Sequence, residues 1–363
     1  MSRVDSARPV LILAGGTGGH IFPALAVAEE LQTRAVPVHW LGGASGLEST
    51  LVPATDIGFT ALPGRGIRGS GWQRKLLGPP RLVFAVYAAL RLIRRLRPRA
   101  AIGFGGYASG AGGLAAWLAR CPLLIHEQNA IPGATNRVLA RFAKRVLTGL
   151  PGAFDNNAVL TGNPVRLEFA QLAAPAERLR GRQGALRLLV VGGSQGAQAL
   201  NAVVPAALAR STYRFEVRHL CGAAHVTETQ AAYREADTTA DVQAFESDMA
   251  SVCVWADLVV ARAGALSLAE FAAAGLPSIL VPYPWAVDDH QSANARVFET
   301  VGAAYLIPQP ELDATRLSAE LDALAEAGRE HLLGMAECAY RLARPDAAVS
   351  VARAVLEVAE ASA

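Results

Sequence analysis

Apolar residues in this 363-residue chain fall into short runs that alternate with longer amphipathic segments. Short apolar runs are typical of buried parallel strands, and the segments between them have helical spacing. The strands predicted in the first half are Val10–Leu13, Val38–Leu41, Ala100–Phe104, Leu123–Ile125 and Arg145–Leu147. The helices predicted between them are Ile21–Arg34, Pro80–Leu96, Ser109–Ala119 and Ala134–Phe142. This alternation predicts a parallel sheet with helices on both faces.

The pattern breaks around Asn163–Arg166, and residues 173–185 read as a surface linker and helix. It then starts again, with strands predicted at Leu186–Val191, Phe215–Leu220, Val242–Phe245, Leu258–Ala261, Ser278–Val281 and Ala303–Ile307. We therefore expect an α/β chain of two doubly wound, Rossmann-like domains. The expected boundaries are 1–165 for the N-terminal domain and 166–345 for the C-terminal domain. A helix in 346–363 is expected to pack back on the N-terminal domain.

A glycine-rich turn, Ala14-Gly15-Gly16-Thr17-Gly18-Gly19-His20, joins the first predicted strand to the first predicted helix. Glycines allow close approach to a ligand, and a helix N-terminus offers free N–H groups and partial positive charge to a phosphate. His20 adds a side chain that can take a proton near neutral pH. The alternative is a tight turn with a surface histidine, but four glycines in five positions exceed what a turn needs. We interpret the turn as an anion-binding loop beside a potential base.

Two common nucleotide-binding motifs do not fit this turn. Its spacing is not G-x-G-x-x-G, and no acidic residue ends the predicted strand at Val38–Gly43. A ribose-binding carboxylate at that place is part of the dinucleotide fingerprint. The turn also lacks the G-K-[ST] of a P-loop. A hydride-transfer enzyme is therefore disfavoured.

Charge is distributed unevenly along the chain. No Asp or Glu lies between Asp56 and Glu127, whereas that interval holds eleven Lys and Arg residues. Since the whole chain has a net charge of +3, the interval carries +11 and the remainder −8. This asymmetry indicates an anionic partner for the first half only.

Targeting and redox signals are weak. No apolar run reaches the roughly 18 residues of a membrane-spanning helix, and residues 1–5 lack the apolar core of a signal peptide. The four cysteines are scattered without a C-x-x-C spacing. This usage predicts buried thiols in a reduced cytosol, without a disulfide framework or zinc site.

The densest polar segment of the second half is Arg262–Glu270, which follows the strand predicted at Leu258–Ala261. Free N–H groups at Ala265 and Leu266 could hold a diphosphate or a base edge. Glu270 could accept hydrogen bonds from both ribose hydroxyls. Alternatively, Ser267-x-x-Glu270 is the pattern of a helix capping box. Arg262 could offset phosphate charge or make only a surface ion pair.

A second polar segment is Val281–Gln291. Asp288, Asp289 and His290 suggest a metal site, but adjacent residues rarely converge on one ion. We favour a metal-independent sugar site in which Gln291 makes hydrogen bonds. Ser194, in the glycine loop Gly192–Ala197, is expected to bind a phosphate oxygen at its helix start.

Together these motifs resemble a known family. The matching segments are Gly15–Ala24, Gly105-Gly106-Tyr107, His126-Glu127-Gln128-Asn129, Gly162–Arg166, Gly192–Ala197, Arg262–Ala265 and Asp289-His290-Gln291-x-x-Asn294-Ala295. Their ordered set is similar to the MurG family of N-acetylglucosaminyltransferases (GT-B, family 28), which convert lipid I to lipid II in peptidoglycan synthesis. The similarity spans nearly the whole chain.

The resemblance implies a GT-B fold, with the loops of the two domains facing each other across a cleft. It implies UDP-N-acetylglucosamine as donor and a lipid-diphosphate-linked N-acetylmuramoyl-pentapeptide as acceptor. It further implies inverting β-1,4 transfer to the C4 hydroxyl, no cofactor and no bound metal. The enzyme would act peripherally on the cytoplasmic face of the bacterial inner membrane, in cell-wall synthesis and hence in cell shape and division.

The resemblance also assigns site residues. Substrate contacts fall on Thr17, Gly18, Gly19, Asn129, Arg166, Ser194, Ala265, Leu266, Ser267, Leu268, Ala269, Glu270 and Gln291. A backbone contact to uracil falls on Glu246, where the family often has an apolar residue. Ala111 stands where the family usually has proline, with little expected consequence.

Inversion requires a base that removes the proton of the acceptor hydroxyl as it attacks the anomeric carbon. We assign His20 as this base, with diphosphate binding as its alternative role. Glu127 or the Tyr107 loop would orient His20 or the acceptor sugar. His126 and Asn136 are further acceptor-side candidates, and Arg262 is a phosphate candidate.

Other GT-B UDP-sugar enzymes, such as a glycolipid synthase or a UDP-N-acetylglucosamine epimerase, are the alternative function. Nucleic-acid binding is disfavoured, because the basic interval lacks interleaved aromatic residues.

We expect residues 64–99 to dock on an anionic membrane, since the acceptor is a lipid. In residues 72–82, Pro79 and Pro80 would start the next helix and leave Leu76-Leu77 on an exposed loop. Basic residues frame its apolar ones: Arg68, Arg74, Lys75 and Arg81 around Leu76, Leu77, Leu82 and Val83. The alternative is that Leu82, Val83, Val86, Leu90 and Ile93 form only the buried face of a core helix.

Overall fold

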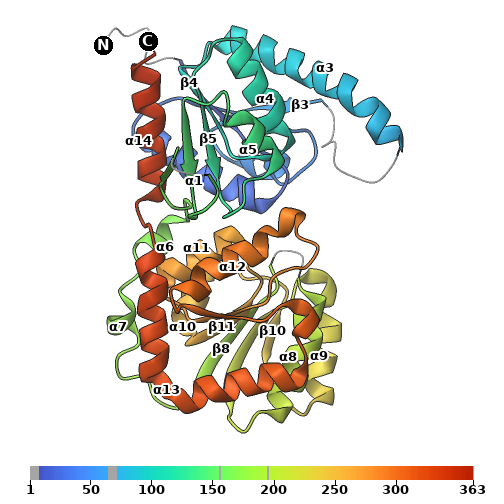
Figure 1. Cartoon of the computed structure of the whole chain (residues 1–363), viewed down its shortest axis with the longest axis vertical. Helices are drawn as coiled ribbons and strands as arrows, with labels where there is room; N and C mark the ends of the chain where they lie inside the picture. The colour runs from blue at the N-terminus through green and yellow to red at the C-terminus, as the bar shows by residue number, and fades with distance from the viewer. Residues whose placement is uncertain (1–7, 64–71, 155–156, 194–195, 363) are drawn as a thin grey trace. The chain divides into compact units, whose positions relative to one another are not determined.

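The chain folds into two compact units, seen in a computed structural model that describes residues 8–63, 72–154, 157–193 and 196–362 (Figure 1). For residues 72–79 only the backbone is described. Unit 1 comprises residues 1–166 and 346–363, and unit 2 comprises 167–345. Among the described residues, no helix is both long enough and apolar enough to cross a bilayer.

Unit 1 is built on a parallel seven-stranded sheet of order β3-β2-β1-β4-β5-β6-β7. Its strands are β1 (Val10–Leu13), β2 (Val38–Gly43), β3 (Gly58–Leu62), β4 (Ala100–Gly103), β5 (Leu123–Glu127), β6 (Arg145–Thr148) and β7 (Ala158–Leu160). In register, Val10 pairs with Val38 on one side and Ala100 on the other. From β1 the chain therefore adds strands toward one edge of the sheet, and from β4 toward the other edge. The loops after β1 and β4 diverge at this point and leave a crevice.

The helices of unit 1 are α1 (Gly18–Thr33), α2 (Glu48–Leu51), α3 (Trp72–Leu96), α4 (Gly106–Leu118), α5 (Ala134–Leu139) and α14 (Ala347–Glu360), with a 3₁₀ turn at Val52–Ala54. Helix α14 buries Val351, Val355 and Val358 at helical spacing in the same core cluster as Val27 and Leu31 of α1. The C-terminal helix therefore completes the core of unit 1.

Unit 2 has a parallel six-stranded sheet of order β10-β9-β8-β11-β12-β13. Its strands are β8 (Leu186–Val191), β9 (Phe215–Leu220), β10 (Asp241–Gln243), β11 (Leu258–Ala261), β12 (Ser278–Leu280) and β13 (Ala304–Leu306). β8 pairs with β9 on one side and β11 on the other, so the reversal lies between β8 and β11. The crevice of unit 2 therefore has the same topological position as that of unit 1.

The α-helices of unit 2 are α6 (Leu167–Ala170), α7 (Pro175–Arg178), α8 (Gln198–Arg210), α9 (Val226–Glu235), α10 (Met249–Trp255), α11 (Ala265–Ala274), α12 (His290–Thr300) and α13 (Ala314–Leu342). Its 3₁₀ turns are Ala223–His225, Val287–Asp289 and Gln309–Glu311. Helix α13 is kinked at Gly328, whose φ is +77°. That backbone conformation suits glycine, since a Cβ would strain it.

The structure has all eleven predicted strands, with ends that differ by at most two residues. It adds β3, β7 and α2, which the apolar pattern did not predict. β7 lies at the sheet edge, and Val159 and Leu160 are exposed there. An edge strand buries too little to leave a clear pattern, which explains its absence from the prediction.

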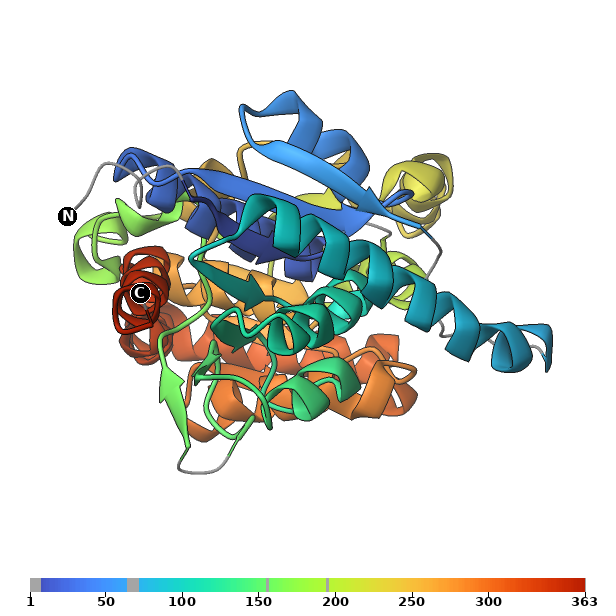
Figure 2. The same cartoon turned by 90° about the horizontal axis from the view of Figure 1, so that it is seen from above.

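The expected exposed loop at residues 72–82 is wrong. The backbone is helical from Trp72, with Pro79 and Pro80 inside α3, and this end of the helix extends away from α4 (Figure 2). Proline disfavours a helix interior because it removes a hydrogen bond and crowds the preceding turn. The flanking segment of good helix formers, Gln73–Leu77, continues the helix regardless. Arg65 and Arg68 lie outside the described residues.

Candidate active site

His20 lies at the crevice of unit 1, in the first turn of α1. Its Nδ1 is 3.3 Å from the carbonyl oxygen of Gly15. Since a carbonyl oxygen only accepts hydrogen bonds, the neutral ring has its proton on Nδ1 and its lone pair on Nε2. The ring is half-buried, and the turn thus presents a histidine tautomer suited to accept a proton.

The remaining residues of this turn are open to a ligand. Thr17 is the N-cap of α1, yet its side chain makes no capping hydrogen bond, and Thr17 and Gly19 are exposed. A Cβ at Gly19 would meet only Thr17 Oγ1, at 3.8 Å. Because the fold itself leaves room for a side chain at Gly19, its glycine suits close approach of another molecule.

Glu48 is a site residue that the sequence reading missed. It begins α2, its exposed fraction is 2%, and its carboxylate reaches back to the glycine turn. Gly43 N donates to Oε1 at 2.9 Å, and Gly16 N is 3.3 and 3.2 Å from Oε1 and Oε2. The buried carboxylate thus fixes the Gly15–Gly16 peptide of the turn.

The turn after β4 closes the other side of this crevice. Buried Ser109 donates to Leu13 O and accepts from Gly105 N at 2.9 Å, which ties β1 to the turn. Gly105 has φ +107°, and a Cβ there would lie 2.9 Å from His20 Nε2. Tyr107 donates its hydroxyl to Pro63 O at 3.2 Å, and burial raises the pKa of Tyr107. The structure therefore brings Tyr107 and His20 to one crevice.

Glu127, at the end of β5, is committed to its own loop. Its Oε1 accepts from Asn129 N and Asn129 Nδ2, both at 3.1 Å, and its Oε2 accepts from Gly133 N at 3.0 Å and Asn136 Nδ2 at 2.9 Å. Glu127 and Asn136 are each 2% exposed. These bonds give Glu127 and Asn136 the role of shaping the loop that presents Asn129.

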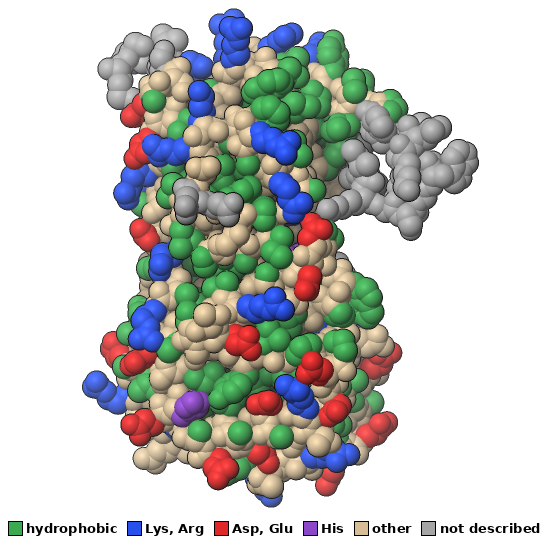
Figure 3. Space-filling view, viewed as in Figure 1, with side chains coloured by type: hydrophobic (Ala, Val, Ile, Leu, Met, Phe, Trp, Pro, Cys, Tyr) green, Lys and Arg blue, Asp and Glu red, His purple; other side chains and the backbone are tan. Residues whose placement is uncertain are grey.

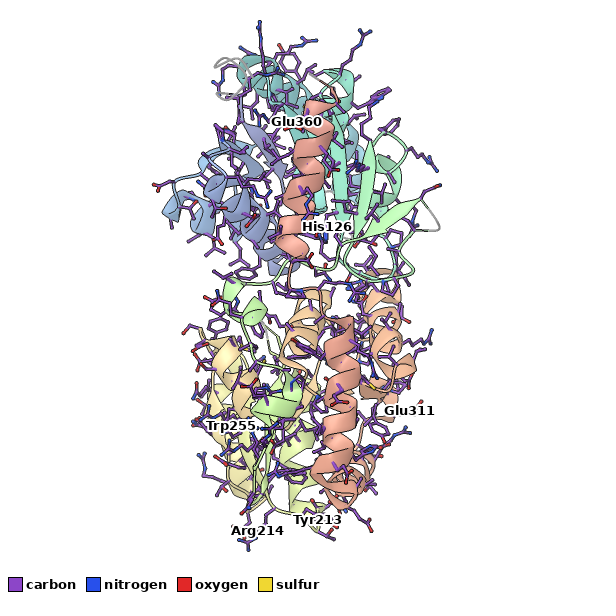
Figure 4. The ribbon with its side chains drawn as sticks, turned by 90° about the vertical axis from the view of Figure 1, so that its left-hand side faces the viewer. His126, Tyr213, Arg214, Trp255, Glu311 and Glu360 are labelled. Atoms are coloured by element: carbon purple, nitrogen blue, oxygen red, sulfur yellow. The ribbon has the colours of Figure 1, made fainter. Side chains whose placement is uncertain are left out.

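His126 is fully buried at the loop end of the sheet, inside unit 1 (Figure 4). Its Nε2 is 3.0 Å from Gly162 O and its Nδ1 is 3.2 Å from Gln128 Nε2. Burial lowers the pKa of His126 to about 4, against the opposing effects of the Gly162 hydrogen bond and the Glu127 charge. A neutral ring that donates from Nε2 and accepts at Nδ1 satisfies both partners, so His126 braces the loop.

In unit 2, helix α11 begins at the crevice beside β11. Its N-cap is Gly264, which offers no side-chain cap, and a Cβ there would meet only Ser267 Oγ, at 4.0 Å. Buried Asn294 donates to Ala263 O at 3.1 Å and so holds the approach to the helix. The N–H groups at Ala265 and Leu266 lie in the first turn, as the sequence predicted.

The capping-box alternative for Ser267 and Glu270 is wrong. A capping box needs Ser267 at the N-cap, whereas α11 already begins at Ala265. Ser267 therefore lies inside the first turn and Glu270 one turn further. Leu268 is buried, and Glu270 is only 8% exposed. The burial of the Glu270 carboxylate is therefore not explained by helix capping.

Arg262 braces the end of the sheet in unit 2. Its Nη1 donates to Val281 O at 3.0 Å and its Nη2 to Gln309 Oε1 at 2.6 Å, and its guanidinium lies over the Tyr283 ring. Burial lowers the pKa of Arg262. The guanidinium therefore joins the loops after β12 and β13, and its contact with a phosphate stays a prediction.

The remaining predicted residues lie in separate places. Gln291 Oε1 accepts from Tyr283 N at 2.9 Å, and the Glu246 side chain accepts from Asp248 N at 2.9 Å. Ala269 is part of α11, and Arg166 is the last residue of unit 1. Ser194 lies outside the described residues. Among the described residues, no group of three His, Cys, Asp or Glu side chains could hold a metal ion.

Comparisons with known proteins agree with this architecture. Residues 10–148 match the glycosyltransferase family 28 N-terminal domain, and residues 187–351 match the family 28 C-terminal domain.

Curated relatives match nearly the whole of this chain. A protein of Alkalilimnicola ehrlichii is 54% identical over 97% of this chain and 99% of its own length. One of Xanthomonas euvesicatoria is 53% identical over 97% of this chain and 81% of its own length. Both are named UDP-N-acetylglucosamine–N-acetylmuramyl-(pentapeptide) pyrophosphoryl-undecaprenol N-acetylglucosamine transferase.

Among solved structures, MurG of Acinetobacter baumannii superposes with a TM-score of 0.86 at 38% identity, covering 96% of this chain and 99% of that one. The two doubly wound units therefore form a GT-B fold, and the chain belongs to glycosyltransferase family 28.

Proposed function

We propose that this chain transfers N-acetylglucosamine from UDP-N-acetylglucosamine to the C4 hydroxyl of the N-acetylmuramoyl-pentapeptide of lipid I, with inversion, to form lipid II. The observation that supports it best is identity of 53–54% over 97% of this chain to relatives named for that donor and acceptor. Polar residues of the two crevices supply a suitable base and a suitable donor site.

For the proton transfer we assign His20 as the general base. The bond from Nδ1 to Gly15 O leaves the lone pair on Nε2, which is the form that accepts a proton. Nucleophilic attack on the anomeric carbon then proceeds through an oxocarbenium-like transition state. Exposed Thr17 and Gly19 leave room for the substrate beside the ring.

For the donor we assign the start of α11, where the N–H groups of the first turn would meet the diphosphate. Glu270 would accept hydrogen bonds from the ribose hydroxyls, and the Glu246 backbone would contact the uracil. Gln291, Ser194, Asn129 and Arg166 would complete the contacts. We assign charge stabilisation of leaving UDP to the helix N-terminus and to the positive charge of Arg262, whose guanidinium is held in place by carbonyl and amide oxygens.

For the membrane we assign a surface of unit 1 on α3 and the ends of α4 and α5. Large apolar side chains are exposed there at Val83, Phe84, Tyr87, Trp117, Leu118 and Val138. The same segments of the chain also hold exposed basic residues: Arg81, Arg91, Arg120, Arg137, Arg141 and Lys144. Val83 is 68% exposed, so it is not part of the buried face of α3, whereas Ile93 is.

Apolar side chains beside cations suit an anionic leaflet, because burial and charge attraction add. On the face in Figure 3, Lys and Arg are the main charged side chains of unit 1, whereas unit 2 shows both signs. This supports a peripheral enzyme on the cytoplasmic leaflet, where the anionic lipids and the UDP-sugar occur.

The test is transfer of labelled N-acetylglucosamine from the UDP-sugar to a lipid I analogue. We expect a labelled disaccharide product and release of UDP that depends on the acceptor. Conversion of the UDP-sugar without any lipid would instead indicate an epimerase, and transfer to a different glycolipid would indicate a different synthase.

A further inference from the structure

One peptide group connects Glu48 to His20. The N–H of Gly16 points to the Glu48 carboxylate, at 3.3 and 3.2 Å from its two oxygens. The carbonyl of Gly15, at the other end of the same peptide, lies 3.3 Å from His20 Nδ1. Carboxylate, peptide and imidazole thus form one continuous chain of hydrogen bonds.

We propose that Glu48 is a positioning residue that acts on the base through the Gly15–Gly16 peptide. Its negative charge fixes the orientation of that peptide and polarises it, so that the Gly15 oxygen becomes a stronger acceptor for the Nδ1 proton. The result is a ring held in one tautomer, with a more basic Nε2. This inference rests on the proposed role of His20 as base.

The physical argument is that a buried carboxylate is costly unless it is compensated. Glu48 is 2% exposed, and its carboxylate accepts hydrogen bonds from the backbone N–H groups of Gly16 and Gly43. Within the described part of the chain, Glu48 forms no ion pair. Two backbone donors are a modest compensation for a buried charge, and a residue that only filled space would more readily be apolar.

Glycines leave the space that each group of this hydrogen-bonded chain occupies. A Cβ at Gly15 or Gly46 would lie 2.5 or 2.4 Å from a Glu48 carboxylate oxygen. A Cβ at Gly106 would lie 2.4 Å from Gly15 O, and one at Gly105 would lie 2.9 Å from His20 Nε2. Side chains at these positions would displace the carboxylate, the peptide oxygen or the ring.

Two other titratable side chains of unit 1 do not compete for this role. On β2, His39 bonds Thr60 Oγ1, and burial together with the Arg95 charge lowers the pKa of His39. On α4, burial raises the pKa of Tyr107, against the opposing charge of Arg81. Both side chains are therefore neutral near pH 7.

On α1 and α14, the charged residues named here pair with other partners or are exposed to solvent. Glu30 pairs with Arg34 on α1, and Glu357 of α14 pairs with Arg145. Arg353 and Glu360 of α14 are exposed to solvent.

The test compares the pH dependence of kcat in full-length Glu48→Gln and Glu48→Asp. Glutamine keeps an oxygen that can accept from Gly43 N and Gly16 N but removes the charge. We expect a roughly ten-fold lower kcat, an unchanged KM for the UDP-sugar, and an acid limb about 0.5–1 pH unit lower, because the protonated ring loses a stabilising charge. Aspartate keeps the charge, so its acid limb should stay in place even if its Tm falls.

A double-mutant cycle with His20→Ala separates this action from a structural one. If Glu48 acts through the ring, Glu48→Gln should not reduce the residual kcat of His20→Ala any further. Asp257→Asn is the matched control: Asp257 is a buried carboxylate of unit 2 that pairs with Arg182, and its variant should lower Tm without moving the acid limb.

The outcomes are distinct. An unmoved acid limb in Glu48→Gln, or an equal loss in both backgrounds, would overturn the inference while His20 remains the base. Wild-type kcat in His20→Ala would overturn the assignment of the base itself, and the inference with it.

Discussion

The two crevices of this protein have the same topology but hold different chemistry. In unit 1, the loops after β1 and β4 surround an imidazole whose Nδ1 is bound to a backbone carbonyl. In unit 2, the loop after β11 leads into a helix whose first turn offers backbone donors, with buried Glu270 one turn further. A doubly wound sheet thus determines where a ligand can bind, and the few residues at its strand ends determine the chemistry of that site.

The comparison indicates a division of labour. A titratable ring with a defined tautomer suits proton transfer, whereas an uncapped helix N-terminus suits a diphosphate. The first crevice has Gly19 and the second has Gly264, and a Cβ at either glycine would have no atom closer than 3.8 Å. Both crevices therefore have room for a ligand, and variants in each should fail in different ways.

The largest expected effect is that of His20→Ala in unit 1. Loss of the base should lower kcat by about 10²–10⁴, the usual contribution of general-base catalysis. The measurement is steady-state transfer to a lipid I analogue, with His331→Ala, an exposed histidine on α13, as control. A kcat within a few-fold of wild type would remove His20 from the reaction.

Next is Glu270→Ala in unit 2. Loss of a carboxylate that accepts from two hydroxyls should raise KM for the UDP-sugar about 10²-fold, since hydrogen bonds to charged groups contribute about 1.5–3 kcal/mol each. Glu311→Ala, which removes an exposed ion pair with Arg316, is the matched control. If only Tm changed, Glu270 would be a structural residue.

The surfaces of the two units should differ as well. Changing Phe84 and Tyr87 to Ser and Arg91 to Glu should weaken binding to anionic vesicles at low salt by about ten-fold or more. Transfer to a short-chain soluble acceptor should persist. Exposed apolar residues of unit 2 give the control, Val301→Ser with Tyr305→Ser. Equal vesicle binding by both variants would move the membrane surface elsewhere.

The smallest difference concerns acid stability, because each unit has one buried neutral histidine. Burial lowers the pKa of His126 to about 4 and that of His219 to about 3. Between those values and the ordinary 6.5, the unfolded chain binds a proton that the folded unit does not. Stability is therefore full above pH 6.5 and falls as pH drops, by about 2 kcal/mol per histidine at pH 5.

Urea unfolding at pH 7 and pH 5 measures this loss. The His126→Gln variant should lose less than the wild type on acidification, and so should His219→Gln. An equal loss in the variants would assign acid sensitivity to other groups, such as the carboxylate of Asp257, whose pKa is held low against burial by Arg329, Arg187 N and Arg182.

Much of this architecture could be predicted from the sequence because parallel strands are buried on both faces. Short continuous apolar runs such as Leu186–Val191 and Leu258–Ala261 are best explained as buried strands. The observed strands β8 and β11 begin and end at these same residues. Edge strand β7 and short helix α2 bury little and leave no such pattern. Helix α3 continues through Pro79 and Pro80 because good helix formers flank the two prolines, so the prolines alone did not predict its start.

The site was predictable where a motif coincided with a strand end, as at His20 and at the start of α11. Glu48 was not, because nothing local marks a carboxylate that acts 32 residues away along the chain. The one signal in the sequence was the set of glycines at 15, 43 and 46. In the structure, a Cβ at any of these positions would collide with the Glu48 carboxylate. Roles such as that of Arg262 depend on the loops that surround it, which no spacing rule gives.

The division of labour is tested most directly by calorimetric binding of UDP to His20→Ala and Glu270→Ala, measured side by side with the wild type. We predict wild-type affinity in His20→Ala, because its defect lies in proton transfer. We predict an affinity about 10²-fold lower in Glu270→Ala, because its ribose contact is lost. A comparable loss of affinity in His20→Ala would contradict this account and make His20 a ligand of the diphosphate.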